Sequence, residues 1–240
     1  MKVLALDTSN QPMSVALLVD QKVIAKKTTA TQLDHSVQLM PTITELMADQ
    51  QWQPEDLDRV VVAQGPGSYT GLRIAVTTAK TLAATLHIQL VGVSSLAVLA
   101  GSVQTEGTFV SPIFDARNTQ LYAGLYQIKD GQPVPVIADQ HTNIPDWTSQ
   151  LNAAGHPVTL IGELTRYHNA LADALDVPAT FTEGNANLPD AGVLGQLGAP
   201  LKAIDDIDSF VPQYLRLSPA EAQWAAAHPG EDHKNYVEEV

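Results

Sequence analysis

Three short apolar-rich segments in the first twenty-nine residues predict a meander of three strands. Residues 2–7, KVLALD, are apolar almost throughout, and residues 13–20, MSVALLVD, alternate apolar residues on one face. Residues 22–29, KVIAKKTT, follow directly after the tight connection Asp20-Gln21. Alternation with a period of two is the pattern of a strand with one buried face.

The pattern changes to the spacing of a helix in residues 33–50, where apolar residues recur every three to four positions. This spacing predicts an amphipathic helix. Pro41 falls inside the segment, and proline is tolerated in the first helical turn but disrupts the interior. The helix therefore either begins near Pro41 or is kinked there.

Strands and helices then alternate up to about residue 105. Residues 59–64, RVVVAQ, are too apolar for a half-exposed strand and suit an interior one. Residues 69–86 carry an apolar stripe typical of a helix, residues 90–93 form a short buried strand, and Ser94 caps another helix. This order predicts an α/β fold.

A second strand pair, TFVSPIFDAR and QLYAGLYQI, follows the linker GSVQTEG. In both halves a strand ends in an aspartate, Asp7 or Asp115, and a short turn leads into the next strand. The likeness indicates either a duplicated α/β unit with a cleft between its halves or a chance similarity of two hairpins. Further along, the pattern predicts helices near 143–154, 164–174 and 189–203, a strand at 157–162 and a capped helix at 218–228.

The glycine-rich segment GPGSYTG, residues 65–71, lies between a predicted strand and a predicted helix. It lacks the Lys-Ser/Thr pair of a Walker phosphate loop, and its glycine spacing is one residue too long for a dinucleotide fingerprint. Helix N-termini bind anions, and Ser68 and Thr70 could donate to one. A tight turn with a helix cap fits the same residues, so both interpretations stay open.

Asp7, Thr8 and Ser9 place a carboxylate and two hydroxyl groups at the end of the first strand. Actin-like ATPases meet a magnesium–phosphate group with such a strand end. The alternative is an Asx turn without a ligand.

Composition excludes several kinds of chemistry. The chain has no cysteine, which removes thiol catalysis, disulfides and cysteine zinc sites, and its seven histidines show no metal-binding spacing. The formal charge of −13 and the lack of a basic cluster disfavour direct nucleic-acid binding and suit a basic protein partner. No apolar run is long enough for a membrane span or a signal peptide, so we expect a cytoplasmic protein.

The segments LALDTS, HSVQLMP, GPGSYTGLR, DARNTQLY and VPQYLR occur in an order and at separations that resemble TsaB, the YeaZ-type family of bacterial proteins. The likeness covers almost the whole chain, and GPGSYTGLR is its most specific segment. It implies an actin-like (ASKHA) fold of two RNase H-like lobes with a reduced second lobe. We therefore expect an N-terminal domain at 1–105 and a smaller α/β domain at 106–240.

The resemblance also implies a function. TsaB proteins act in forming N6-threonylcarbamoyladenosine at position 37 of tRNA, as a non-catalytic scaffold that heterodimerises with the catalytic subunit TsaD. The ATPase TsaE joins them, TsaC supplies the activated group, tRNA is met only through the complex, and TsaB alone homodimerises. The helices of the first half form the surface that meets TsaD. Carried over, the residues of that surface are His35, Leu39, Met40, Ile43, Met47, Arg73, Ile74 and Leu82, although these apolar positions fit a monomer core equally well.

The residues agree with a non-catalytic role. TsaD-type proteins bind their metal through closely spaced histidines, whereas this chain offers only His35 in that region, and Gly192 and Gly195 are not the adjacent pair found near adenosine in the superfamily. We expect no metal and no tightly bound cofactor, with ATP or ADP at most weakly bound at a shared interface. The residues expected for such a nucleotide or anion site are Asp7, Thr8, Ser9, Gly65, Gly67, Ser68 and Thr70.

Two alternatives come from other functional classes. Asp7, Thr8 and the glycine loop also fit a small-molecule kinase or ATPase of the actin-like superfamily. A peptidase has no nucleophile–base set or metal cluster to support it.

Overall fold

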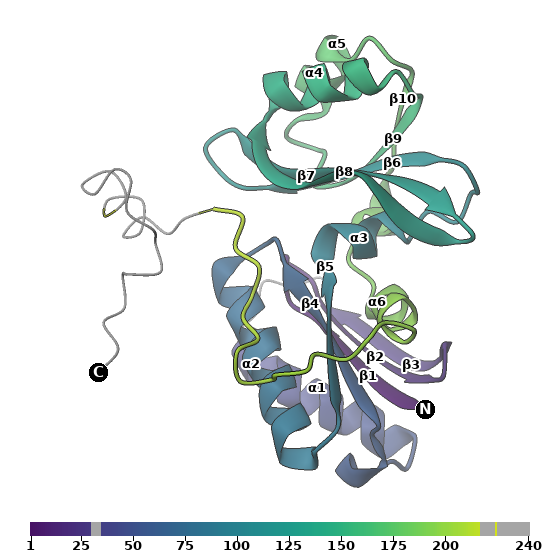
Figure 1. Cartoon of the computed structure of the whole chain (residues 1–240), viewed down its shortest axis with the longest axis vertical. Coiled ribbons are helices and arrows are strands. Elements are labelled where there is room, and N and C mark those ends of the chain that lie inside the picture. The colour runs from purple at the N-terminus through teal and green to yellow at the C-terminus, as the bar shows by residue number, and fades with distance from the viewer. Residues whose placement is uncertain (30–34, 217–223, 225–240) are drawn as a thin grey trace.

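The computed structural model describes residues 1–29, 35–216 and 224, and it arranges them in two lobes, each built on a five-stranded sheet (Figure 1). The helix expected at residues 218–228 lies outside the described residues, apart from Trp224. No helix within the described ranges is long and apolar enough to cross a membrane.

The first sheet has the strand order β3-β2-β1-β4-β5. An antiparallel meander is followed by two strands parallel to β1, and the expected strands are confirmed. The strands are β1 (Lys2–Asp7), β2 (Met13–Val19), β3 (Lys22–Thr29), β4 (Arg59–Gly65) and β5 (Gln89–Ser94). A short 3-10 helix, η1 (Pro54–Asp56), precedes β4.

Helices cover both faces of this sheet, which explains why β1 and β4 are apolar on both sides. α1 (His35–Asp49) and α2 (Tyr69–Leu86) pack against one face, where Leu4 and Leu6 point. α6 (Ala191–Gly198) packs against the other face, where Val3 and Ala5 point. Pro41 lies on the exposed side of α1, which begins at His35, so the helix does not start at the proline.

The second sheet repeats the topology of the first, with the order β8-β7-β6-β9-β10. It too is an antiparallel meander followed by two parallel strands, so the duplication is real and not a chance similarity of hairpins. The strands are β6 (Phe109–Asp115), β7 (Gln120–Lys129), β8 (Gln132–Asn143), β9 (Val158–Gly162) and β10 (Ala179–Phe181). The accompanying helices are α4 (Ile144–Ala154), α5 (His168–Ala174) and the 3-10 helix η2 (Gly184–Asn187).

One short helix, α3 (Ser95–Ala100), joins the two lobes and lies between the sheets in Figure 1. Leu96 and Leu99 pack into an apolar cluster with β6 and β7, while Val98 belongs to the cluster between α6 and the first sheet. The helix is therefore part of both cores.

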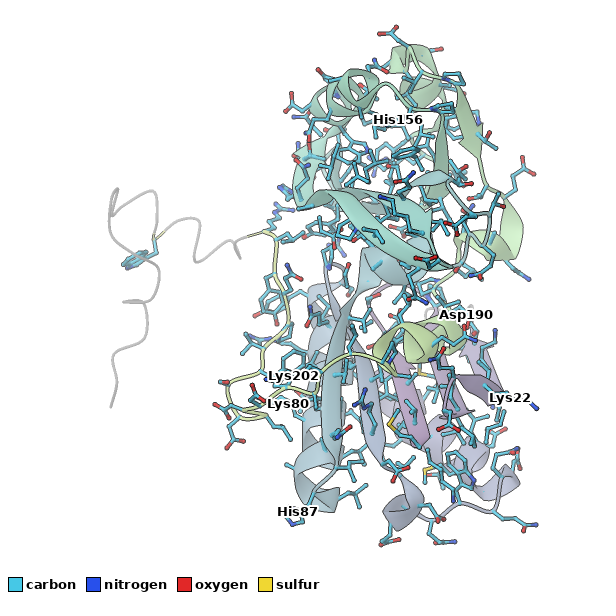
Figure 2. The ribbon with its side chains drawn as sticks, turned by 45° about the vertical axis from the view of Figure 1, so that its right-hand side comes forward. Lys22, Lys80, His87, His156, Asp190 and Lys202 are labelled. Carbon is cyan, nitrogen blue, oxygen red and sulfur yellow. The ribbon has the colours of Figure 1, made fainter. Side chains whose placement is uncertain are left out.

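The chain returns to the first lobe after η2. Glycines of α6 allow close packing, since a Cβ at Gly195 or Gly198 would overlap the side chains of Leu18 and Val61. Figure 2 places Asp190, at the start of α6, beside the strands of the first lobe, where it pairs with Lys26 at 2.6 Å.

The segment after α6 then runs along β5 and α2. The amide of Ile204 donates to the carbonyl of Leu90, and Lys80 donates to the carbonyls of Asp208 and Phe210 at 2.8 Å each. The expected boundary at residues 105 and 106 falls in the loop between α3 and β6. However, residues 190–213 pack on the first sheet, which the glycines of α6 and the apolar residues after it cover.

Candidate functional site

A cleft of about 1030 Å³ lies between the two lobes. Ser9, Ser68 and Thr70 line it from the first lobe, and Asp115, Arg117 and Glu163 line it from the second. Both sets stand at the carboxyl ends of the central strands or at a helix start, which is where α/β sheets place their ligand sites.

The strand end Asp7-Thr8-Ser9 forms a compact turn. The amide of Ser9 donates to Oδ1 of Asp7 at 2.8 Å, which is the geometry of an Asx turn. Thr8 Oγ1 donates to the carbonyl of Gly71 at 2.6 Å and so ties β1 to the start of α2. Asp7 and Thr8 are fully buried and do not line the cleft, whereas Ser9 does.

The Asp7 carboxylate is in an unfavourable place for a charge. Its Oδ2 has no hydrogen-bond partner among the described residues. Burial raises the pKa of Asp7, and hydrogen bonding from Ser9 and the charge of His35 oppose this only in part. Keeping the Asp7 carboxylate ionised in the folded protein therefore costs folding free energy.

The glycine loop packs directly on this turn. The amide of Ser68 donates to the carbonyl of Ser9 at 2.7 Å, and Ser68 Oγ caps α2 by accepting from the amide of Gly71 at 3.3 Å. A Cβ at Gly67 or Gly71 would overlap the carbonyl oxygens of Ser9 and Thr8, respectively. These glycines are needed for close backbone approach, because no side chain fits there.

The seven residues expected for an anion site lie at the end of β1 and around the start of α2, and four of them line the cleft: Ser9, Gly67, Ser68 and Thr70. Gly65 lies one step further in, where a Cβ would stand 2.5 Å from the carbonyl oxygen of Gln213. Of the seven residues, Ser68 and Thr70 are the exposed ones, at the N-terminus of α2. A cap and a tight turn account for the hydrogen bonds observed here.

The second lobe presents a partly exposed carboxylate at the equivalent strand end. Oδ1 of Asp115 accepts from the amide of Arg117 at 2.7 Å and from the hydroxyl of Tyr167 at 2.6 Å, and Arg166 lies 3.3 Å from Oδ2. Burial opposes ionisation, but these donors and the Arg166 charge outweigh it, so the pKa of Asp115 is lowered.

Glu163 is a cleft residue that the sequence analysis missed. It follows β9 directly, and its Oε2 accepts from the amide of Asp115 at 2.6 Å. Burial raises the pKa of the Glu163 carboxyl. Its position at the end of a buried strand, shared with Asp7 and Asp115, is the signal that could have identified it.

Within the part of the chain that the structure describes, no group of three or more His, Asp or Glu residues could hold a metal ion. His35 lies in the segment that corresponds to the metal-binding histidines of TsaD-type proteins. Its Nε2 atom is 2.9 Å from the carbonyl oxygen of Gln11.

The residues expected at a partner surface divide into three groups, which are buried, exposed and partly exposed. Leu39, Ile43 and Met47 are buried in the core between α1 and the first sheet, so they do not offer an exposed surface. Met40, by contrast, is 46% exposed, and Arg73 is exposed at the N-terminal end of α2.

The remaining members of that set are partly exposed: His35, Ile74 and Leu82. Arg73 lies over the ring of Tyr69, 4.4 Å from its centroid, and its Nε donates to the hydroxyl of Tyr214 at 3.1 Å. An aromatic pair thus holds this cation in the first turn of α2.

Comparison with known proteins agrees with this architecture. A family model described as TsaD, tRNA N6-adenosine threonylcarbamoyltransferase, matches residues 22–224. The tRNA threonylcarbamoyladenosine biosynthesis protein TsaB of Bacillus subtilis is 42% identical over 225 residues, covering 93% of this chain and 98% of that protein. TsaB of Escherichia coli is 32% identical over 129 residues, which is 53% of this chain and 55% of that protein.

The solved structure of YeaZ from Pseudomonas aeruginosa superposes with a TM-score of 0.77 at 26% identity, covering 89% of this chain and 99% of that one. The expected two-lobe α/β fold is confirmed by this likeness and by the repeated sheet topology. The chain therefore belongs to the family that the TsaD model describes and, within it, to the TsaB (YeaZ-type) proteins of tRNA threonylcarbamoyladenosine biosynthesis.

Proposed function

We propose that this protein is a non-catalytic scaffold in the formation of N6-threonylcarbamoyladenosine at position 37 of tRNA. It binds TsaD through α1 and α2, and TsaE joins the pair in the cytoplasm. The chain homodimerises through the same face when TsaD is absent. Because the protein is strongly acidic, with 26 acidic and 13 basic residues, tRNA contacts belong to its partners.

The burial of Asp7 at the end of β1 is the observation that supports the non-catalytic role. In an actin-like enzyme this carboxylate would have to reach a metal-bound phosphate, yet here Asp7 is fully buried and does not line the cleft. The glycine loop packs its backbone onto Thr8 and Ser9, where such a group would need space. The described residues around Asp7 therefore do not fit a magnesium–phosphate group.

The glycines of α6 support the same conclusion. Gly192, Gly195 and Gly198 face the first sheet: a Cβ at Gly195 or Gly198 would overlap Leu18 or Val61, and a Cβ at Gly192 would stand 3.0 Å from Val23. They serve helix–sheet packing and do not form a pocket for an adenosine.

The surface that fits a protein partner is the part of α1 and α2 where apolar side chains are exposed. Val37 and Met40 are 66% and 46% exposed, and Ile74 and Leu82 are partly exposed on the neighbouring helix. Exposed apolar side chains grouped on one face are typical of interaction sites. ATP or ADP binds at most weakly, at the interface shared with TsaD, where Ser68 and Thr70 stand at the N-terminus of α2.

A matched pair of variants tests the proposal. Met40 and Val136 are both 46% exposed, but Val136 lies on β8 in the other lobe. We expect Met40→Asp to abolish co-elution with TsaD and to reduce tRNA modification at least tenfold in a reconstituted reaction, while Val136→Asp changes neither. Equal behaviour of the two variants would reject the α1–α2 surface, and full modification without this protein would reject the scaffold role.

The cleft of about 1030 Å³ favours one alternative, a small-molecule kinase or ATPase, because its size suits a nucleotide. Calorimetry of the isolated protein with Mg-ATP distinguishes the two functions. A Kd below about 10 μM, roughly −7 kcal/mol, together with turnover by this subunit alone, would favour the kinase.

A further inference from the structure

Three polar side chains outside the cleft meet at the junction of the two lobes. Ser94 ends β5 of the first sheet and caps α3, while Tyr126 and Asp139 come from β7 and β8 of the second sheet. One carboxylate oxygen of Asp139 accepts from Ser94 Oγ, and the other accepts from the hydroxyl of Tyr126. Asp139 therefore holds a direct side-chain link between the lobes.

The Ser94 hydroxyl has a double role in this link. Its Oγ accepts from the amide of Ala97 at 3.1 Å, and this hydrogen bond caps the helix that belongs to both cores. The same oxygen lies 3.4 Å from the Tyr126 hydroxyl. Asp139 is thus hydrogen-bonded to the residue that caps α3.

The second sheet is shaped around the carboxylate. The pairing of β7 with β8 shifts register on both sides of Leu125, next to Gly124. A Cβ at Gly124 would stand 2.5 Å from Oδ1 of Asp139, so only glycine leaves room for it. A bulge of this kind re-aims a side chain that a regular ladder would direct elsewhere.

A gain in stability does not explain why an aspartate is buried at this junction. Burial raises its pKa against the effect of both hydroxyl donors, so the ionised form costs folding free energy. Buried ionic groups are best attested as devices that select one arrangement among several. Here the arrangement they could select is that of one sheet relative to the other.

We propose that Asp139 is a positioning residue that fixes the angle between the two lobes, and thereby the width of the cleft, by holding the edge of the second sheet to the cap of α3. The proposal does not depend on the role in tRNA modification, because it concerns the isolated chain.

Distance measurements between spin labels test it directly. The chain has no cysteine, so Lys22→Cys on β3 and Ala172→Cys on α5 give one exposed label in each lobe. Figure 2 shows Lys22 projecting from the margin of the first lobe, away from the junction. In this background the distance distribution should be narrow and have one peak.

We expect Asp139→Ala to broaden this distribution at least about twofold or to shift its maximum. Tyr126→Phe removes the hydroxyl donor but keeps the aromatic ring. It should change the distance distribution in the same direction by less. Gln140→Ala is the matched control, because the side chain of the neighbouring Gln140 bonds to Gln150 within the second lobe, at 2.9 and 3.2 Å.

Circular dichroism identifies the variants that remain folded. If folded Asp139→Ala and Tyr126→Phe chains both give the distribution of Gln140→Ala, the proposal is wrong. If Asp139→Ala does not fold, the Tyr126→Phe result alone decides, since a broadened distribution supports the proposal and an unchanged one overturns it.

Discussion

Asp7 and Asp115 end the first strands of the two sheets, and each accepts a hydrogen bond from the amide two residues later, at 2.8 Å and 2.7 Å. The two turns share this hydrogen bond, but the surroundings of the two carboxylates differ. Burial raises the pKa of Asp7, whereas Tyr167, Arg117 and Arg166 lower that of Asp115 despite partial burial. The two lobes therefore have an aspartate at the same strand end, but its carboxylate has opposite effects on stability in the two places.

The first prediction concerns Asp7→Asn. Because the pKa of Asp7 is raised in the folded state, folding binds protons, and the free energy of unfolding falls as the pH rises above about 4. Asparagine removes this dependence while its Oδ1 still accepts from Ser9. Between pH 4.5 and pH 7.5, the free energy of unfolding measured in urea should rise in the variant, relative to the unchanged protein, by on the order of 1 kcal/mol.

The same variant separates scaffold from kinase. We expect tRNA modification to be retained by Asp7→Asn, since Asp7 does not line the cleft. A large loss of modification without a loss of stability would contradict that expectation and assign Asp7 a chemical role.

The second prediction has the opposite sign. The lowered pKa of Asp115 means that its charge stabilises the fold above about pH 4 and that this contribution is lost as the pH falls. Asp115→Asn should reduce the free energy of unfolding by about 1 kcal/mol at pH 7, a limited loss because solvent screens the partly exposed group. The difference in free energy of unfolding between the two proteins should be smaller at pH 3.5 than at pH 7, and an equal difference at both pH values would refute the assignment.

The third prediction concerns Gly71→Ala. In an ordinary helix this change stabilises by about 1 kcal/mol, but here the new Cβ overlaps the backbone carbonyl of Thr8. We expect instead a loss of about 2 kcal/mol in the free energy of unfolding. Thr70→Ala, the exposed neighbour, serves as control and should change stability by less than about 0.5 kcal/mol. A stabilised Gly71→Ala protein would show that the loop can move away from β1.

The fourth prediction concerns the anchor of α6. Arg59 is 7% exposed, and its guanidinium donates to the carbonyls of Gly198, Ala199 and Leu201 at 3.0, 2.6 and 2.9 Å. Arg59→Met leaves these carbonyls unpaired and should cost about 2–4 kcal/mol, with earlier proteolysis after α6.

A control for this prediction lies in the same segment. Lys202 pairs with Asp205 at the surface, where both side chains are about 80% exposed. Lys202→Met should leave thermal unfolding nearly unchanged, and a comparable loss in both variants would remove the special role of Arg59.

The pattern of the sequence was sufficient for most elements of the first lobe, because apolar periodicity and burial coincide there. It missed β8, whose first half is exposed and contains Pro133 and Pro135, features that edge strands tolerate and that weaken a strand signal. It also assigned α6 to the second half, since helix–sheet packing by glycines leaves no mark of which sheet is covered.

The site was predictable at the level of residues but not of roles. Leu39 and Met40 are adjacent apolar positions on one helix, yet Leu39 is 1% and Met40 46% exposed, which only the direction of α1 over the sheet decides. Asp139 gave no signal at all, because its importance comes from a register shift in β7 and β8 and from a serine in the other lobe.

The return of α6 to the first sheet has a consequence for synthesis on the ribosome. The first lobe is started first but closed last, because the nascent chain must emerge through residues 191–198 before the face formed by Val3, Ala5 and Ala16 is covered. The second lobe is complete before that moment. A prematurely terminated product therefore displays a bare apolar sheet face, the kind of surface that chaperones and proteases recognise.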